Sequence, residues 1–344
     1  MTADLRKSAF AICDDRRPRL VITAGDPCGI GPEVILKALA AGGRPSVSLL
    51  VIGDLAVFEE AARRLRLSLP AWTLASSVSH AAGVTRPLVF LDLGHRWRFV
   101  PGRPSARAGE AAAAYLDAAI ALLRRGWANG LVTAPVTKWA IEQARGRFEG
   151  QTEYLARALH TPRVLMMFVS DRLRVALLTR HVALREVPKH LTKARVREGI
   201  VLAAEGLRRH FGIRHPRLAV CGLNPHAGEA GLFGSEERRV LMPALKACRR
   251  RGIRVEGPFA ADGFFAEPRD YDAVLCGYHD QGLIPFKLLS RDRGCQLTVG
   301  LPVVRTSPDH GSALDIAGQG RAHPGSMRYA LALAERLLSR VHSR

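Results

Sequence analysis

The sequence predicts an α/β protein with a doubly wound, mostly parallel sheet and two domains. Short apolar runs rich in β-branched residues alternate with longer segments of helical character along most of the chain. Strands that alternate with helices are typical of parallel sheets covered by helices on both faces. The length of 344 residues is enough for two domains. Because no low-complexity linker interrupts the chain, we expect the second domain to be an excursion from the first.

The first half of the chain contains four expected strands with helices between them. The strands are expected at 19–24, 47–53, 88–93 and 131–133, and the helices at 34–41, 55–65 and 105–125. The first strand ends at the turn GDPCGIGPE (25–33), in which glycines precede a Pro-Glu helix start. This layout brings backbone close to a ligand. It is not a GxGxxG fingerprint, and a tight structural turn is an equal alternative.

The second half is expected to mix strand directions. The runs 164–169 and 173–179 are close enough to pair as an antiparallel hairpin. A helix is expected to begin at 150–153, with Thr152 near its cap. The remaining expectations are helices at 192–211, from 235 and at 326–338, strands at 217–224, 271–276 and 294–300, and a loop at Arg305.

Three strand-like runs are each followed within a few residues by a histidine. These residues are His181, His226 and His279, and Asp280 follows the last of them. Ligands of open α/β sheets bind at the carboxyl ends of the strands, so the three histidines are expected to converge. Three neutral imidazoles are a common ligand set for a catalytic divalent metal. The alternative is that each histidine caps its own strand or helix.

Composition excludes several classes of protein. The chain is 47% hydrophobic and 24% charged, which indicates a globular fold. We expect no membrane span and no secretory signal, because no apolar run is long enough. The six scattered cysteines, without a CxxC pair, are typical of a reducing cytoplasm. The net charge of +20 is spread along the chain without a nucleic-acid motif, so it favours a basic surface that attracts anionic substrates over a nucleic-acid partner.

Six ordered motifs resemble the 4-hydroxythreonine-4-phosphate dehydrogenase family over residues 20–338. They are GDPCGIGPE (25–33), TAPVTK (133–138), GQTEYLA (150–156), LNPHAGEAG (223–231), YHDQGLIPFK (278–287) and GLPVVRTSPDHGSALDIAG (300–318). The stretch HGSALDIAG also resembles the adenosine-binding loop of isocitrate and isopropylmalate dehydrogenases. The resemblance implies a two-domain α/β/α fold of that kind, a homodimer with a shared active site, and a cytoplasmic location.

The resemblance also implies a division of the chain and a set of site residues. Residues 1–135 with 290–344 would bind the dinucleotide, residues 136–289 would hold metal, substrate and dimer contacts, and the active site would lie in the cleft between them. The implied metal ligands are His181, His226 and His279. The implied substrate-binding residues are Gln151, Thr152, Lys287, Gln296 and Arg305, the catalytic residues are Lys287, Asp280 and Asp262, and the cofactor-binding residues are Gly311, Ser312, Ala313 and Asp315.

The implied reaction is NAD- or NADP-dependent oxidation of a phosphorylated 3-hydroxy acid, followed by decarboxylation. The implied substrate is 4-hydroxy-L-threonine 4-phosphate, an intermediate of pyridoxal 5′-phosphate biosynthesis. The divalent metal is expected to be zinc, with magnesium, cobalt and manganese as alternatives. Lys287 would neutralise the substrate's phosphate or carboxylate, or act as general base.

Two residues depart from the family pattern. Gln151 replaces a histidine, and Gln296 replaces an asparagine. Glutamine keeps hydrogen bonding but cannot carry a positive charge. The alternatives are therefore the same chemistry on threonate or erythronate 4-phosphate, or on an aromatic cis-dihydrodiol dicarboxylate in a catabolic pathway. A three-histidine metal hydrolase is a further alternative, against which the dinucleotide loop argues.

Overall fold

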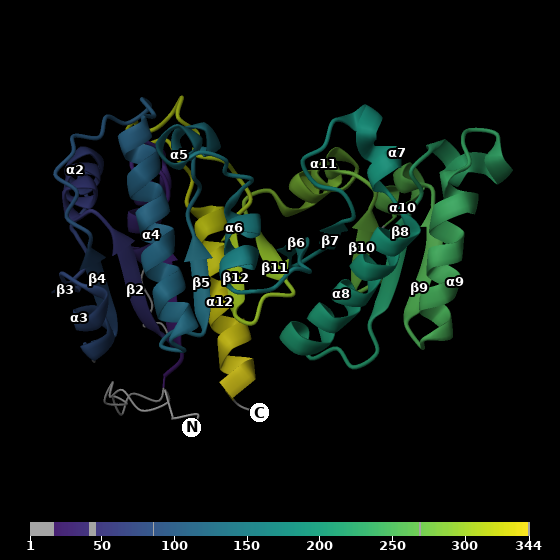
Figure 1. Cartoon of the computed structure of the whole chain (residues 1–344), viewed down its shortest axis with the longest axis horizontal. Coiled ribbons are helices and arrows are strands. Elements are labelled where there is room, and N and C mark those ends of the chain that lie inside the picture. The colour runs from purple at the N-terminus through teal and green to yellow at the C-terminus, as the bar shows by residue number, and fades with distance from the viewer. Residues whose placement is uncertain (1–16, 41–45, 85, 268–269, 343–344) are drawn as a thin grey trace, which may run out of the picture. The chain divides into compact units, whose positions relative to one another are not determined.

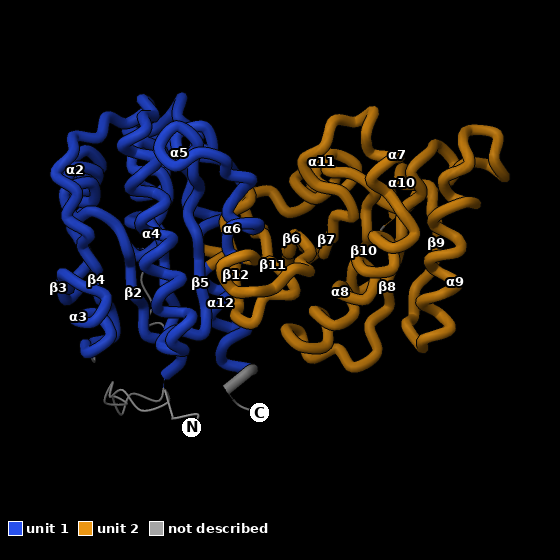
Figure 2. The backbone as a smooth tube through the Cα atoms, viewed as in Figure 1, with its two compact units in different colours: residues 1–155, 310–327, 331–344 blue, residues 156–309, 328–330 orange. Residues whose placement is uncertain are grey.

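The computed structural model describes residues 17–40, 46–84, 86–267 and 270–342. Residues 1–155, 310–327 and 331–344 form unit 1, and residues 156–309 and 328–330 form unit 2 (Figure 2). The chain thus leaves the first unit and returns to it.

Unit 1 is built on a parallel sheet of five strands in the order β3-β4-β2-β1-β5 (Figure 1). Its strands are β1 (Arg19–Thr23), β2 (Ser48–Gly53), β3 (Thr73–Ala75), β4 (Leu88–Asp92) and β5 (Gly130–Thr133). Its helices are α1 (Gly31–Ala40), α2 (Leu55–Leu65), α3 (Val78–Gly83), α4 (Ala106–Arg124), α5 (Lys138–Arg145), α6 (Gln151–Ala158), whose last residues belong to unit 2, and α12 (Gly325–His342). The parallel pairing confirms the predicted sheet.

Unit 2 contains a mixed sheet in the order β12-β11-β6-β7-β10-β8-β9. Its strands are β6 (Leu165–Ser170), β7 (Arg174–Leu177), β8 (Arg217–Cys221), β9 (Arg254–Phe259), β10 (Ala273–Cys276), β11 (Gly294–Val299) and β12 (Val304–Pro308). Its helices are η1 (Leu184–Glu186), α7 (Val187–His190), α8 (Lys193–Phe211), η2 (Pro225–Gly231), η3 (Glu237–Leu241), α9 (Met242–Arg250), α10 (Ala261–Ala266) and α11 (His279–Ser290). The predicted hairpin is present as the antiparallel pair β6 and β7.

Local sequence explains where the long helices α4 and α8 begin. The Ser105 side chain accepts a hydrogen bond from the backbone N–H of Ala108 at the start of α4, at 3.2 Å. The Thr192 side chain accepts one from Arg195 at the start of α8, also at 3.2 Å. Such caps satisfy backbone N–H groups that the helix itself leaves unpaired. Gly212 ends α8 in the left-handed conformation, which a glycine adopts without strain.

Packing and strand pairing decide which unit each segment belongs to. Residues 136–155 stay with unit 1, because α5 packs along α4. Ile141 and Phe148 lie in one apolar cluster with Leu116 of α4. Residues 290–309 stay with unit 2, because β11 pairs with β6 and with β12.

Each unit has its own apolar core. Phe58, Phe90 and Tyr115 are among the largest fully buried side chains of unit 1. Cys221 and Cys276 lie in the core of unit 2 with Phe286. The five described cysteines are free and buried. In the ranges that the structure describes, no helix is both long and apolar enough to cross a membrane.

Candidate active site

Hydrogen bonds tie together the ends of the three strands that precede the histidines. β10 lies between β7 and β8 and is parallel to both. The Thr179 hydroxyl after β7 donates to the carbonyl of Gly277 after β10, at 2.6 Å. The Gln281 side-chain amide donates to the carbonyl of Gly222 after β8, also at 2.6 Å. The three strand ends therefore form one fixed edge, as the sequence predicted for a ligand site.

Two of the three histidines lie together at this edge. The ring centroids of His181 and His279 are 5.9 Å apart. His279 is the first residue of α11, and its Nδ1 lies 2.7 Å from the Asp280 carboxylate. An ionised carboxylate only accepts, so this contact places a proton on Nδ1. The Nε2 lone pair of His279 is then available to a metal, with Asp280 fixing the ring.

His226 lies in a loop of unusual backbone conformation. It begins a stretch in which four non-glycine residues have positive φ, His226 itself at 50°. Its ring lies 6.0 Å from the ring of Phe233. The described residues contain no group of three or more His, Cys, Asp or Glu side chains arranged to hold a metal. The structure thus brings His181 and His279 together and leaves His226 exposed on the neighbouring loop.

A buried carboxylate that the motifs did not single out organises the His226 loop. Glu237 accepts hydrogen bonds from the backbone N–H groups of Leu223 and Asn224, both at 2.8 Å, and from the Asn224 side chain at 2.9 Å. Glu237 is only 4% exposed. The sequence shows that Glu237 lies near the start of a helix. It does not show that the Glu237 side chain binds this loop.

The predicted catalytic residues of unit 2 lie on two helices. Asp262 is in α10, and Asp280 and Lys287 are in α11. All three are exposed. Asp280 and Lys287 are seven residues apart, which places them on one face of the helix. A ligand could therefore reach both side chains without any change in the core of unit 2.

Gln296 and Arg305 form a buried polar cluster across β11 and β12. The Arg305 guanidinium donates to the Gln296 side-chain carbonyl and, at 3.0 Å, to the Thr298 hydroxyl. The Ser307 hydroxyl donates to the same Gln296 oxygen at 2.9 Å. The expected loop at Arg305 is wrong, because residues 304–308 pair with β11 as a strand and Arg305 is 2% exposed.

In unit 1 the turn 25–33 meets the predicted cofactor loop. The Ser312 carbonyl accepts from the Ile30 backbone N–H at 3.0 Å. A Cβ on Gly29 would lie 3.0 Å from the Ser312 Cβ, so a side chain there would crowd the loop. The hydroxyls of Ser312 and Thr137 are 3.0 Å apart. Burial raises the pKa of Asp26 in the same turn, against hydrogen bonds from Thr137 and from the Cys28 backbone.

The remaining predicted residues of unit 1 differ in exposure. Gly311 and Asp315 are exposed, and Ser312 and Ala313 are half-buried. On α6, Thr152 is buried. The Gln151 amide donates to the Ala134 carbonyl at 3.1 Å. Its buried carbonyl oxygen has no hydrogen-bond partner in the described part of the chain, so it can accept from a ligand that approaches α6.

A family model supplies the comparison that decides the family. Residues 46–334 match the model described as "Pyridoxal phosphate biosynthetic protein PdxA". The chain belongs to the PdxA family. A relative from Desulforapulum autotrophicum, named 4-hydroxythreonine-4-phosphate dehydrogenase, is 42% identical over 93% of this chain and 95% of its own. A relative of the same name from Methylorubrum extorquens is 42% identical over 96% of this chain and 97% of its own.

Solved structures agree with this family assignment. The chain is similar to a 4-hydroxythreonine-4-phosphate dehydrogenase from Klebsiella pneumoniae, with a TM-score of 0.81, 35% identity and coverage of 93% and 99% of the two chains. It is also similar to a terephthalate 1,2-cis-dihydrodiol dehydrogenase from Burkholderia xenovorans LB400, with a TM-score of 0.62, 31% identity and coverage of 93% and 98%. The PdxA fold is thus shared with enzymes named for two different substrates.

Proposed function

We propose that this chain is an NAD(P)-dependent dehydrogenase that oxidises 4-hydroxy-L-threonine 4-phosphate and decarboxylates the product to 3-amino-2-oxopropyl phosphate. The observation that carries the proposal is the identity of about 42% to relatives of that name along nearly the whole chain. The hydrogen-bonded strand ends of unit 2 support it, because they present His181 and His279 together.

The residues fit a divalent metal, which we propose to be zinc. His181 and His279 offer imidazole nitrogens from neighbouring strand ends, and the contact of Nδ1 with Asp280 leaves Nε2 of His279 as the nitrogen that would bind the metal. We propose His226 as the third ligand, carried by the next strand in the sheet. When bound, the metal would lower the pKa of the substrate hydroxyl and stabilise the negative charge that develops in both steps.

The proposed mechanism assigns a proton acceptor and an electron acceptor. Lys287, in its neutral form, would take the hydroxyl proton while the carbon transfers a hydride to the nicotinamide of NAD(P)⁺. The resulting β-keto acid loses CO₂, and the carbon that carried the carboxylate takes up a proton. Thr152, Gln151 and Arg305 would bind the substrate, and Asp262 would support the proton transfers. Ser312 and Asp315 would hold the dinucleotide in unit 1.

Two observations favour a second substrate class. Gln151 and Gln296 stand where the family pattern has histidine and asparagine, and a neighbour with a TM-score of 0.62 is named for a dihydrodiol of terephthalate. The same oxidation and decarboxylation on that dihydrodiol, or on threonate or erythronate 4-phosphate, is therefore the second candidate. It uses the same histidine edge, because the oxidation and decarboxylation are the same.

The experiment is a turnover assay of the zinc-loaded protein that follows reduced nicotinamide by absorbance. The panel contains 4-hydroxythreonine 4-phosphate, threonate 4-phosphate, erythronate 4-phosphate and the terephthalate dihydrodiol, and His279→Ala is the inactive control. Preference for the first compound supports the proposal. Turnover of another member alone moves the protein to the second candidate. No turnover of any, with no binding of a dinucleotide, overturns both.

Further features of the family are part of the same proposal. We propose a cytoplasmic homodimer in which both subunits contribute to each active site. The molar mass in solution, measured by light scattering during size-exclusion chromatography, tests the dimer. A monomer that turns over substrate would contradict the shared site.

A further inference from the structure

Unit 2 contains a cavity of about 300 Å³ that the proposed chemistry does not use. Three segments line it: the turn 160–163 before β6, the second half of α8, and the end of β11 with Gly300. None of the residues proposed to bind metal, substrate or cofactor is among its described lining residues. Its volume is at the lower end of the range of roughly 300–1,000 Å³ found for ligand sites, so it suits a small molecule.

Two glycines set how closely these segments approach one another. A Cβ on Gly206 of α8 would lie 2.6 Å from the Cγ1 methyl of Val299, at the end of β11. Gly300 has a φ of +102°, and a Cβ there would lie 2.3 Å from the backbone oxygen of Arg163. A backbone atom cannot move aside as a flexible side chain can. The turn before β6 is therefore held against the end of β11, and the backbone fixes this wall of the cavity.

A buried histidine in the lining has a nitrogen without a partner. His210, near the end of α8, is 2% exposed and lines the cavity. Its buried Nδ1 has no hydrogen-bond partner in the part of the chain that the structure describes. Burial, with a contribution from the charge of Arg209, lowers the pKa of His210 to about 4, so the ring is neutral at neutral pH. A neutral imidazole has one N–H that it can donate.

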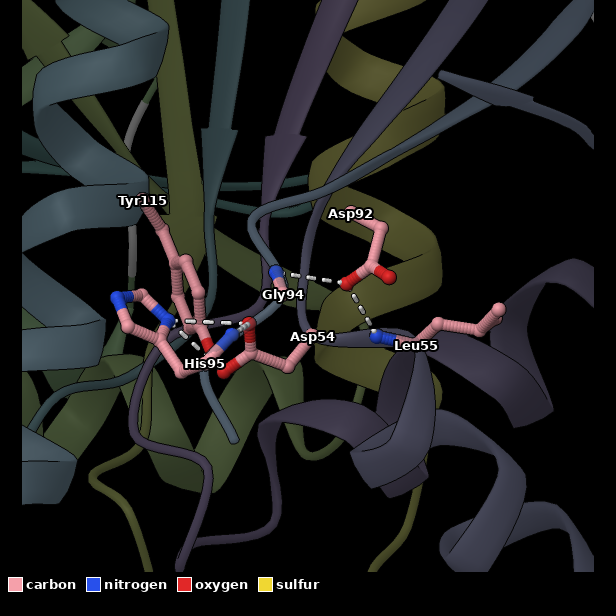
Figure 3. Close-up of polar contacts among 6 residues, drawn as sticks. All are labelled: Asp54, Leu55, Asp92, Gly94, His95 and Tyr115. Atoms are coloured by element: carbon pink, nitrogen blue, oxygen red, sulfur yellow. Dashed lines mark hydrogen bonds and ion pairs between the residues drawn. The ribbon is translucent and has the colours of Figure 1, made fainter. Parts of the chain in front are cut away.

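A buried acid of unit 1 shows how such groups are normally satisfied (Figure 3). Asp54 is also 2% exposed, and it accepts from the Tyr115 hydroxyl at 2.7 Å. It accepts as well from the backbone and the ring of His95, at 3.1 and 3.0 Å. Buried polar groups are rarely left without such partners, because burial removes their hydrogen bonds with water. The unpartnered nitrogen of His210 therefore indicates that a further molecule completes the cavity.

Cationic side chains outnumber acids around this histidine. Arg163 and Arg209 line the cavity, and the acid in the described lining is Glu205. His160 lines it as well and adds an imidazole. These four residues are exposed, whereas His210 is buried, so the guanidinium groups are open to a ligand that arrives from solvent. The surplus of positive charge favours an anion.

Arg209 is already held in position and has donors to spare. Its guanidinium donates to the carbonyls of Leu301 and Pro302, at 3.3 and 2.7 Å. A guanidinium has five N–H groups, so three of them have no partner among the described residues and remain for a ligand. The two carbonyls belong to the connection between β11 and β12, the strands of Gln296 and Arg305. The cavity thus borders the segment that joins two proposed substrate residues.

Arg163 is the second available guanidinium. Its Nε lies 3.7 Å from the Glu198 carboxylate, which is beyond hydrogen-bond distance. Arg163 and Arg209 come from different segments, and His210 adds a third donor. Donors from several sides suit a tetrahedral phosphate, whose oxygens accept in several directions, whereas one guanidinium is enough for a planar carboxylate.

We propose that this cavity binds a small phosphate anion, either inorganic phosphate or the phosphate group of a small ester. Arg163 and Arg209 bind its oxygens from the exposed side, and the N–H of His210 donates to it from the buried side. The site is separate from the proposed dehydrogenase site, because no proposed metal, substrate or cofactor residue is among its described lining residues. Its occupation does not depend on turnover.

Nuclear magnetic resonance of the full chain with ¹³C-labelled histidine rings tests the inference. The signals of His160 and His210, assigned with His160→Gln and His210→Gln, are expected to shift together as inorganic phosphate is added, with a Kd on the order of 1 mM. His215 is exposed and does not line the cavity, so its signal is the control. Shifts of His181 or His279 report separately on the proposed active site. A His210 signal that does not move at about 20 mM phosphate, or that potassium chloride of equal ionic strength moves as far, overturns the proposal.

The two arginines are tested by substitution. Arg163→Gln with Arg209→Gln is expected to weaken phosphate binding at His210 by at least about tenfold. Arg163→Gln alone, which leaves the contacts of Arg209 intact, should weaken it about threefold. Arg195→Gln with Arg214→Gln removes the same charge from exposed positions outside the cavity and should change the Kd by less than about twofold. Equal weakening by both pairs would show general attraction to a basic surface and no defined site. A thermal unfolding scan confirms that each variant is folded.

Glycerol 3-phosphate distinguishes the two sources of the phosphate group. Binding at His210 that is tighter than that of inorganic phosphate identifies an ester as the ligand, and weaker binding identifies inorganic phosphate. Glycerol itself, at the same concentration, should leave the His210 signal in place. A shift with glycerol equal to that with the ester would overturn the choice of an anion.

Discussion

His210 is a buried residue whose titration the structure opposes. It is 2% exposed at the end of α8, and burial, with a contribution from Arg209, lowers its pKa to about 4. A histidine with an unperturbed pKa near 6.5 in the unfolded chain binds a proton there before the native state does. Falling pH therefore favours unfolding in the window between about 6.5 and 4. At neutral pH the residue is an uncharged part of the core.

We expect the wild-type free energy of unfolding to fall by up to about 2 kcal/mol from pH 7 to pH 5 through His210 alone. His210→Gln removes the titrating group and should flatten that part of the pH dependence. His215→Gln, an exposed histidine in the same unit, should leave it unchanged. Urea unfolding at the two pH values measures the difference. Equal slopes for the wild type and His210→Gln would show that His210 is not responsible.

Arg305 combines a structural contact with a proposed substrate contact, and the two roles can be separated. Arg305→Lys keeps the charge but loses the planar fork that reaches Gln296 and Thr298. We expect the KM for the phosphorylated substrate to rise about tenfold, with a smaller change in kcat. Ser307→Ala removes another hydrogen bond to Gln296 without touching the cation. If Ser307→Ala raises KM equally, or if Arg305→Lys lowers only the melting temperature, Arg305 is not a substrate residue.

At the scale of elements, α4 and α5 pack closely because one residue of α4 has no side chain. A Cβ on Gly109 would lie 1.9 Å from the backbone oxygen of Ala140 in α5. A backbone atom cannot move aside as a flexible side chain can. We expect Gly109→Ala to destabilise the protein by about 2–3 kcal/mol in urea unfolding. Gly83→Ala is the control, since no atom lies within 4 Å of its Cβ, and it should be neutral or slightly stabilising. Equal effects of both changes would refute the close packing.

Elements with strong local signals could be predicted, and those made by pairing could not. The helix at 55–65 follows from its pattern, and the Thr192 cap marks the start of α8. β3 has only three residues, too few for an alternating pattern. β12 contains Arg305 and ends in proline, which is typical of a loop, and only its pairing with β11 makes it a strand. Tertiary context decides such segments.

The candidate site, like the fold, could be predicted from the sequence only in part. The rule that ligands bind at strand ends predicted that His181 and His279 lie together, because it depends only on sheet topology. The conformation of the loop at His226 depends on residues with positive φ and on Glu237, which is distant in sequence. No periodicity signals such a loop. The cavity beside His210 was also invisible, since its lining comes from segments that only the folded sheet brings together.

At the scale of the whole molecule, metal and fold are expected to be separable. The proposed ligands lie on exposed strand ends of unit 2, whereas the cores of both units are apolar and complete without them. Removing divalent metal with a chelator should therefore abolish turnover and leave the circular dichroism spectrum unchanged. Adding zinc should raise the melting temperature, because a ligand at 100 times its Kd stabilises the native state by about 2.7 kcal/mol.

The variants decide which histidines hold that metal. His181→Ala and His279→Ala should each remove most of the zinc-induced rise in melting temperature, because each takes one of the two adjacent imidazoles. His190→Ala, an exposed histidine of the same unit on α7, should retain it. His226→Ala is the sharper test, because its loop must bring the third imidazole to the other two. Loss of the rise in His226→Ala would establish that metal binding reorganises residues 226–230. A full rise in all of the variants would place zinc elsewhere and leave the histidine edge without a metal.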